Sequence, residues 1–125
     1  MTFWLFVGIA VAGGLGACCR LVLDGAVRSR VAGAFPWGTV LINLLGSFLL
    51  GLLTGLVSAQ ILPEAIRLVA GVGFLGGFTT FSTASFETVR LLQARKWVAG
   101  ILNGLGVMAG TGALAALGLW VGNAL

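Results

Sequence analysis

Residues 73–83 read Gly-Phe-Leu-Gly-Gly-Phe-Thr-Thr-Phe-Ser-Thr, in the middle of a segment that is otherwise apolar enough to cross a lipid bilayer. A helix that faces lipid gains nothing from such a run, because glycine weakens the helix and hydroxyl groups need hydrogen-bond partners. Irregular backbone at membrane depth survives only where protein or a water-filled cavity satisfies its N–H and C=O groups. The run therefore predicts a broken membrane-spanning helix that lines an ion pathway.

The composition of the whole chain is typical of an integral membrane protein. Of its 125 residues, 59% are hydrophobic and only 8% are charged, which is too little polar surface to cover a soluble globule. A helical span needs about 20 apolar residues, and prolines, glycines and charges divide the chain into four such spans. We expect an all-α protein with one transmembrane domain over 1–125 and spans near 3–23, 37–62, 66–92 and 97–121.

Residues at the expected span ends support this division. Pro36 and Pro63 can each begin a helix, because the N–H group that proline lacks would be unpaired there anyway. All four tryptophans also fall at expected span ends, at the level of the lipid headgroups that their amphipathic rings favour. These tryptophans are Trp4, Trp37, Trp97 and Trp120.

The basic residues predict a single orientation in the membrane. The first and third connections of a four-span chain share one side, and six of the seven basic residues lie in or beside them, whereas Arg67 alone lies on the other side. The positive-inside rule then places these two connections in the cytoplasm and both termini outside. Single basic residues at span ends also argue against a nucleic-acid partner. The six are Arg20, Arg28, Arg30, Arg90, Arg95 and Lys96.

The ionisable residues offer little for catalysis. The chain has no His and no Tyr, and its acids are Asp24, Glu64 and Glu87. Asp24 is one helical turn from Arg28, and Glu87 is three residues before Arg90, so we expect ion pairs at span ends. An enzyme is therefore not expected. A small proton-coupled multidrug antiporter, which would need an acid deep within a span, remains the less favoured alternative.

Neutral hydrogen-bond donors are what remains at membrane depth. Hydroxyl and amide groups without nearby negative charge suit an anion that must shed its water, and the edge of the Phe81 ring carries positive quadrupole that can face an anion. Hydrogen bonding between helices is an equally good interpretation for Ser47, Ser85 and Thr111 taken singly. The donors expected along the pathway are Asn43, Thr80, Ser82, Thr83, Asn103 and Thr111.

Three motifs together resemble the Fluc (CrcB) family of fluoride channels. They are Gly-Gly-Leu-Gly-Ala-Cys-Cys-Arg at 13–20, Gly-Thr-Val-Leu-Ile-Asn-Leu-Leu-Gly-Ser-Phe at 38–48, and the run at 73–83. The match covers all four spans in order. It implies a passive fluoride-specific channel of the bacterial plasma membrane that lowers cytoplasmic fluoride, with two chains in an antiparallel, dual-topology dimer.

The resemblance also implies roles for individual residues. The backbone carbonyls of Gly76 and Thr79 would hold a structural sodium ion at the dimer centre, and Arg20 matches a structural arginine near the end of the first span. Phe81, Ser82, Thr83 and Asn43 would line the fluoride path, with Asn103 and Thr111 near polar positions of the fourth span.

Two departures from the family pattern matter. The family commonly has a second phenylalanine three residues after the first, where this chain has Ala84. Homodimers of the family insert in both orientations and carry little charge bias, whereas the bias here is strong. The alternative is therefore a non-conducting or partly conducting partner subunit of a heterodimer with an oppositely oriented paralogue.

Overall fold

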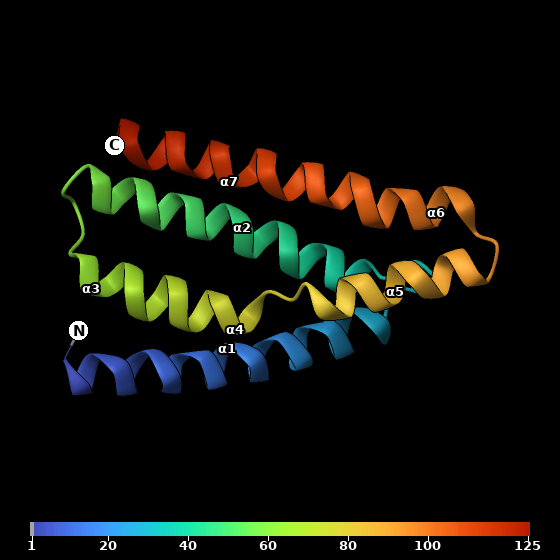
Figure 1. Cartoon of the computed structure of the whole chain (residues 1–125), viewed down its shortest axis with the longest axis horizontal. Helices are drawn as coiled ribbons and strands as arrows, with labels where there is room; N and C mark the ends of the chain where they lie inside the picture. The colour runs from blue at the N-terminus through green and yellow to red at the C-terminus, as the bar shows by residue number, and fades with distance from the viewer. Residues whose placement is uncertain (1) are drawn as a thin grey trace.

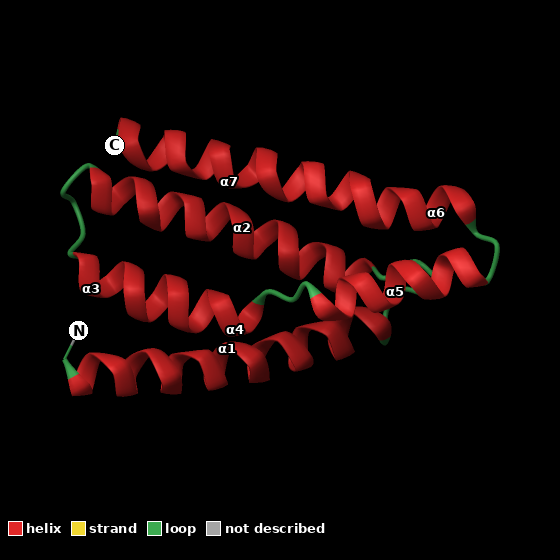
Figure 2. Ribbon diagram, in the orientation of Figure 1, coloured by secondary structure: helices red, strands yellow, loops and turns green. Residues whose placement is uncertain are grey.

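The chain folds into long helices that run side by side, as the computed structural model shows for residues 2–125 (Figures 1 and 2). Within these residues, four helical segments are long and apolar enough to cross a membrane, which confirms the four-span, all-α prediction. The elements are α1 (Phe3–Arg28), α2 (Trp37–Ser58), α3 (Glu64–Ile66), η1 (Arg67–Leu75), α4 (Gly76–Phe78), α5 (Ser82–Gln93), α6 (Trp97–Ile101), η2 (Leu102–Gly106) and α7 (Val107–Ala124), where η marks a stretch with wider, π-type turns.

The ends of the spans differ from the expected positions by a few residues. The first helix continues past residue 23 to Arg28, because its last turn is held by an ion pair between Arg28 and Asp24. The second helix ends at Ser58 instead of 62, since Gln60 takes a positive φ of 61° in the following turn. Pro36 and Pro63 precede α2 and α3 as N-caps, as expected of residues that begin a helix.

The third span is broken within the predicted run. Its first half comprises α3, η1 and α4 and ends at Phe78, after which Thr79 is extended (φ −78°, ψ 159°). Helical structure resumes at Ser82 with α5. The break is visible in Figure 1 as the thin stretch between α4 and α5. The predicted interruption is therefore confirmed.

Glycines let α1 approach the first half of the third span at backbone distance. A Cβ atom added to Gly16 would collide with the carbonyl of Phe74, and one added to Gly77 would collide with the carbonyl of Gly13. Such contacts between small residues are how helices pack closely in a membrane. They fix α4, and with it the start of the break, against α1.

A second glycine seam joins α2 to α7, which pack along most of their length. A Cβ atom on Gly55 would meet the Cα of Gly122 at 2.8 Å, and Gly118 lies equally close to the backbone of α2. The helix order across the bundle is therefore α7, α2, the first half of the third span and α1, as Figure 1 shows. This leaves α5, α6 and η2 together beyond the break.

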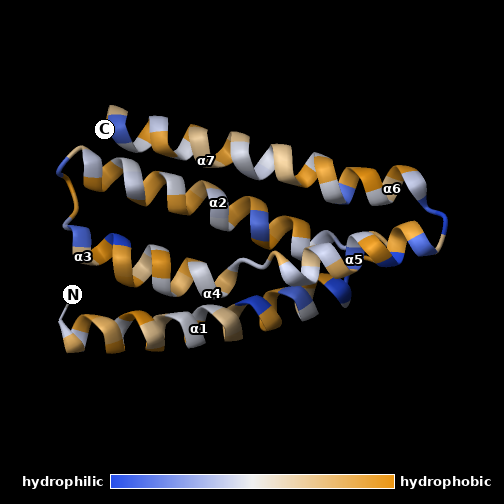
Figure 3. Cartoon of the chain, viewed as in Figure 1, coloured by the Kyte–Doolittle hydropathy of each residue, from blue (hydrophilic) through white to orange (hydrophobic). Residues whose placement is uncertain are grey.

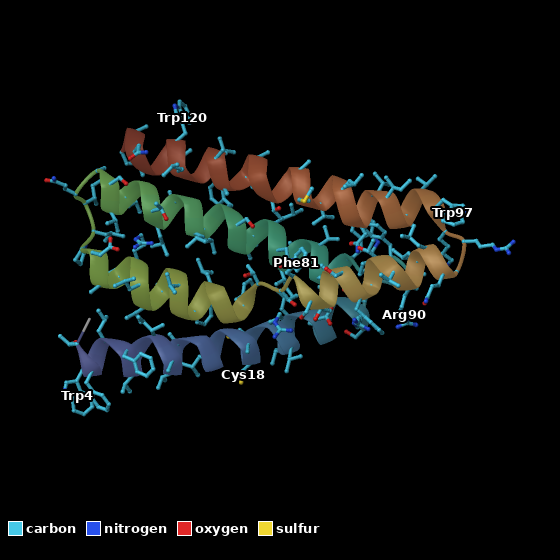
Figure 4. All side chains as sticks on the ribbon, viewed as in Figure 1. Trp4, Cys18, Phe81, Arg90, Trp97 and Trp120 are labelled. Atoms are coloured by element: carbon cyan, nitrogen blue, oxygen red, sulfur yellow. The ribbon has the colours of Figure 1, made fainter. Side chains whose placement is uncertain are left out.

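Polar residues gather at the ends of the bundle, and apolar residues cover its sides (Figure 3). The connections α1–α2 and α5–α6 lie at one end, opposite both termini and the α2–α3 connection (Figure 1). The exposed rings of Trp4 and Trp120 lie near one end and that of Trp97 near the other (Figure 4). The two connections that hold most of the basic residues thus share one end, as the sequence predicts.

Candidate functional site

Asn43 holds the broken backbone of the third span. Its Nδ2 donates to the carbonyl of Thr80 at 2.8 Å, and its Oδ1 accepts from the N–H of Thr80 at 2.8 Å. The side chain is buried, with 8% of Asn43 exposed. One amide therefore satisfies both backbone groups of Thr80, as irregular backbone at this depth requires. No sequence pattern predicts this second role of Asn43, a residue expected along the pathway.

The two helix ends that meet at the break are capped by side chains. Arg20 donates from Nε to the carbonyl of Gly77 at 3.3 Å, near the end of α4. On the other side, the hydroxyl oxygen of Thr80 accepts from the N–H of Thr83 at 3.2 Å, in the first turn of α5. Helix termini leave such groups without helical partners. Arg20, from the expected structural position on α1, thus reaches the break across the glycine seam.

A groove of about 540 Å³ opens beside the break. Asn43 lines it from α2, Thr80 and Phe81 from the break, Asn103 from η2 and Thr111 from α7. The structure therefore brings together five of the seven residues expected along the pathway. The other two, Ser82 and Thr83, are not among the groove residues; Ser82 is exposed, and Thr83 lines a separate cavity.

Phe81 projects away from its own chain. It is 85% exposed, more than any other large apolar residue that the structure describes, although it lies in the middle of the third span. Figure 4 shows its position at the break, beside α2. Ala84 also lines the groove, one turn further along α5, and contributes only a methyl group. The aromatic wall of this groove thus consists of one ring.

Asn103 ties η2 to α5. It is 3% exposed, and its Nδ2 donates to the hydroxyl oxygen of Thr88 at 2.8 Å and to the carbonyl of Ala84 at 3.3 Å. Thr88 in turn donates to the same carbonyl at 2.8 Å. Both N–H bonds of this amide are therefore occupied within the chain. Asn103 lines the groove as a fixed part of its wall.

A second cavity of about 530 Å³ lies between the end of α1, the start of α2 and α5, at the end of the bundle that carries most of the basic residues. Arg28 crosses it and pairs with Asp24 at 3.1 Å and with Glu87 at 3.4 Å. The expected pair between Glu87 and Arg90 is wrong, because the guanidinium of Arg90 lies over the Phe86 ring, 5.9 Å from its centroid. Spacing along one helix could not reveal the pair between α1 and α5.

The acids of the chain are thereby all accounted for. Asp24 and Glu87 share Arg28, and Glu64 pairs with Arg67 at the start of the third span. One atom stands apart: Oε1 of Glu87 is buried and has no hydrogen-bond partner among residues 2–125. The described residues contain no group of three or more His, Cys, Asp or Glu side chains that could hold a metal ion.

Comparison with known proteins assigns the family. Residues 7–120 match the family model described as CrcB-like protein, Camphor Resistance (CrcB). A relative from Leifsonia xyli, named fluoride-specific ion channel FluC 1, is 52% identical over 122 residues, which cover 98% of this chain and 89% of the relative. FluC of Magnetococcus marinus is 46% identical over 91% of this chain and 94% of its own length, and FluC 2 of Mycobacterium tuberculosis is 40% identical over 97% and 93%. With its four spans, the chain is a multi-pass membrane protein of the CrcB family, as the three motifs predicted.

Proposed function

We propose that the chain is a subunit of a fluoride-specific ion channel that lets fluoride leave the cytoplasm passively. The observation that carries this proposal is the break at Thr79–Phe81, which the Asn43 amide holds open onto a groove of neutral donors. Relatives that match nearly the whole chain are named fluoride-specific channels. Fluoride is small and strongly hydrated, so a path for it must supply hydrogen bonds in place of water.

A passive pore is sufficient for export. Hydrogen fluoride is a weak acid that crosses lipid uncharged and dissociates in the more neutral cytoplasm, so the anion accumulates there and can leave down its own gradient. No energy source has to be coupled to this flow. The pairing of all three acids with arginines also disfavours the antiporter alternative, since its proton carrier must be available to substrate and solvent.

The groove supports assembly with a second chain. One chain leaves Phe81 almost fully exposed at mid-span, beside a groove that is open on one side. A partner related by a two-fold axis in the membrane plane would cover both and would build two equivalent paths at one interface. We propose this antiparallel arrangement because the break lies at mid-span, where an inverted copy brings its own break to the same depth.

The identity of that second chain has two candidates. Ala84 leaves the groove with one ring, and the basic residues favour a single orientation, so a paralogue with the opposite charge bias and an aromatic residue at this position would complete the pore. Relatives named FluC 1 and FluC 2 are consistent with paired paralogues. Under this alternative the chain alone conducts little or no fluoride.

The break can also supply oxygens for a structural sodium ion. The hydrogen bonds around it reach the carbonyls of Leu75, Gly77 and Thr80, and within residues 2–125 none is found to those of Gly76 or Thr79. Two carbonyls are too few for a hard cation, which takes about six oxygen ligands, but an inverted copy would double the set. These residues therefore fit a sodium site at the dimer centre, where the ion would neutralise the converging carbonyl dipoles and join the subunits.

Fluoride efflux from liposomes tests the proposal. The purified chain, alone and together with a candidate paralogue, is reconstituted into vesicles loaded with potassium fluoride, and release is followed with a fluoride electrode after valinomycin is added. Efflux from the chain alone supports the homodimer, and efflux only from the mixture supports the heterodimer. The proposal is wrong if neither sample releases fluoride, or if release requires a pH gradient.

A further inference from the structure

The hydroxyl groups that line the groove fall into two classes. Thr79, Thr88 and Thr111 each donate to a carbonyl of their own helical segment, at 3.0, 2.8 and 2.8 Å. The hydroxyls of Ser47 and Ser85 line the same groove, are half-buried, and have no hydrogen-bond partner among residues 2–125. A hydroxyl that is already donating must give up that bond before it can bind an anion. The Thr80 hydroxyl, also in the groove, accepts from the N–H of Thr83 at 3.2 Å and lies 3.5 Å from the Ser82 hydroxyl. Ser47 and Ser85 are therefore the groove hydroxyls with no hydrogen-bond partner among residues 2–125.

Asn43 keeps one donor for the groove as well. A carboxamide has two N–H bonds, and the hydrogen bond to the carbonyl of Thr80 uses one of them. Asn103 differs, because its two N–H bonds go to Ala84 and Thr88. Apart from the Thr80 hydroxyl, which is engaged with Thr83 and Ser82, the groove donors that bond no acceptor among residues 2–125 are therefore one N–H of Asn43 and the hydroxyls of Ser47 and Ser85.

The directions of the two helices place these donors at different depths. Ser47 follows Asn43 by one turn of α2, and Ser85 follows Phe81 by one turn of α5. The two helices run in opposite directions (Figure 1), and Asn43 is bonded to Thr80 beside Phe81. Ser47 therefore lies about one turn, roughly 5.4 Å, on one side of Asn43, and Ser85 lies about one turn on the other side.

We propose that Ser47, Asn43 and Ser85 form a file of three anion-binding positions, with the two serines as direct fluoride ligands on either side of the break. This assignment rests on the proposed fluoride channel and deepens it. Conduction needs several sites that each bind weakly enough to release the ion, and three donors spaced by about a helical turn provide such a series. Thr111 and Asn103, whose donors are occupied, form the wall of this file.

The proposal is tested by removing each hydroxyl from the assembly that conducts in liposomes. Ser47→Ala and Ser85→Ala are each expected to slow fluoride efflux about tenfold or more, because a hydrogen bond to a charged group is lost. Ser47→Thr and Ser85→Thr keep the hydroxyl and should recover at least part of the flux. Thr54→Val is the matched control, since the Thr54 hydroxyl is also on α2 but donates to Leu50 and lies outside the groove.

Measurement of the oligomeric state distinguishes serines that bind fluoride from serines that contact the partner subunit. We expect the serine variants to keep the wild-type size in size-exclusion chromatography and in cross-linking. Wild-type efflux from both alanine variants would overturn the proposal and leave the channel function standing. A loss of dimer that accounts for the loss of flux would also overturn it, because the serines would then bind the partner chain. Absence of efflux from the wild-type assembly would instead refute the channel function itself.

Discussion

Substitution of Asn43 by alanine tests how the break is held. The change removes the amide that pairs with both the N–H and the carbonyl of Thr80, each at 2.8 Å. Thr80 is only half-buried, and the groove beside it admits water, so part of the loss is recovered by solvation. An unpaired buried polar group costs about 1–3 kcal/mol. Two groups at the lower end of that range give about 2 kcal/mol of lost local stability.

Hydrogen exchange at the Thr80 amide measures this loss of local stability directly. A change of about 2 kcal/mol raises the population of the open state roughly 30-fold, so hydrogen exchange at this amide should accelerate by a similar factor. Fluoride efflux should fall sharply at the same time, because the groove loses both a donor and the backbone geometry that Asn43 maintains. The fold of the single chain should persist, since the glycine seams between its helices are untouched.

Two further variants sharpen the test. Asn43→Asp can still accept from the Thr80 N–H but adds negative charge to the groove, so it should protect the amide better than alanine and still block fluoride. Asn123→Ala, at the exposed end of α7, is the control and should change neither measurement. If the Asn43→Ala variant keeps the wild-type rate of hydrogen exchange at the Thr80 amide and the wild-type rate of fluoride efflux, the Asn43 side chain neither holds the break nor lines the path.

Four other outcomes follow from the structure. Gly77→Ala should destabilise the protein because its Cβ would strike the backbone of α1, whereas Gly14→Ala, with open space around it, should be tolerated; thermal melts in detergent compare them. Phe81→Ile should slow fluoride efflux several-fold with the dimer intact, because it removes the positive ring edge, and unchanged efflux would exclude the ring from the path. Arg20→Gln should cost about 1 kcal/mol of stability by weakening the cap on Gly77, which a denaturant titration would detect. Exchange of sodium for potassium should weaken the dimer if carbonyls at the break hold sodium, and an unaffected dimer would argue against that site.

Much of the fold follows from the sequence, because membrane burial imposes simple constraints. Apolar stretches, prolines and tryptophans predict four spans. The run at 73–83 predicts the break, because its glycines weaken a continuous helix and its hydroxyls would lack partners in lipid. Which glycines make contacts is less predictable. The chain has 21 glycines, and the contact of Gly55 with Gly122 depends on the register between α2 and α7, which sequence spacing alone does not fix.

The sequence predicts which residues lie beside the groove better than it predicts the hydrogen bonds that each of them makes. Polarity at membrane depth identified Asn43, Asn103 and Thr111, and a ring edge within the hydroxyl cluster identified Phe81; the structure places these four beside the groove. The hydrogen bonds that these side chains make depend on neighbours that are distant in sequence. Asn43, for example, bonds Thr80, which lies 37 residues away. The same limitation explains the wrong partner for Glu87, whose arginine comes from α1. Free and occupied donors look identical in a sequence and can be separated only by the hydrogen bonds of the folded chain.

The reversal potential of the reconstituted assembly tests the central claim most directly, namely that the broken third span lines a path for fluoride. A planar bilayer with opposed gradients of fluoride and chloride gives each anion its own equilibrium potential. We expect the current to reverse at the fluoride potential in the wild type and to vanish in Asn43→Asp. A reversal at the chloride potential, or a current that persists unchanged in that variant, would contradict the account.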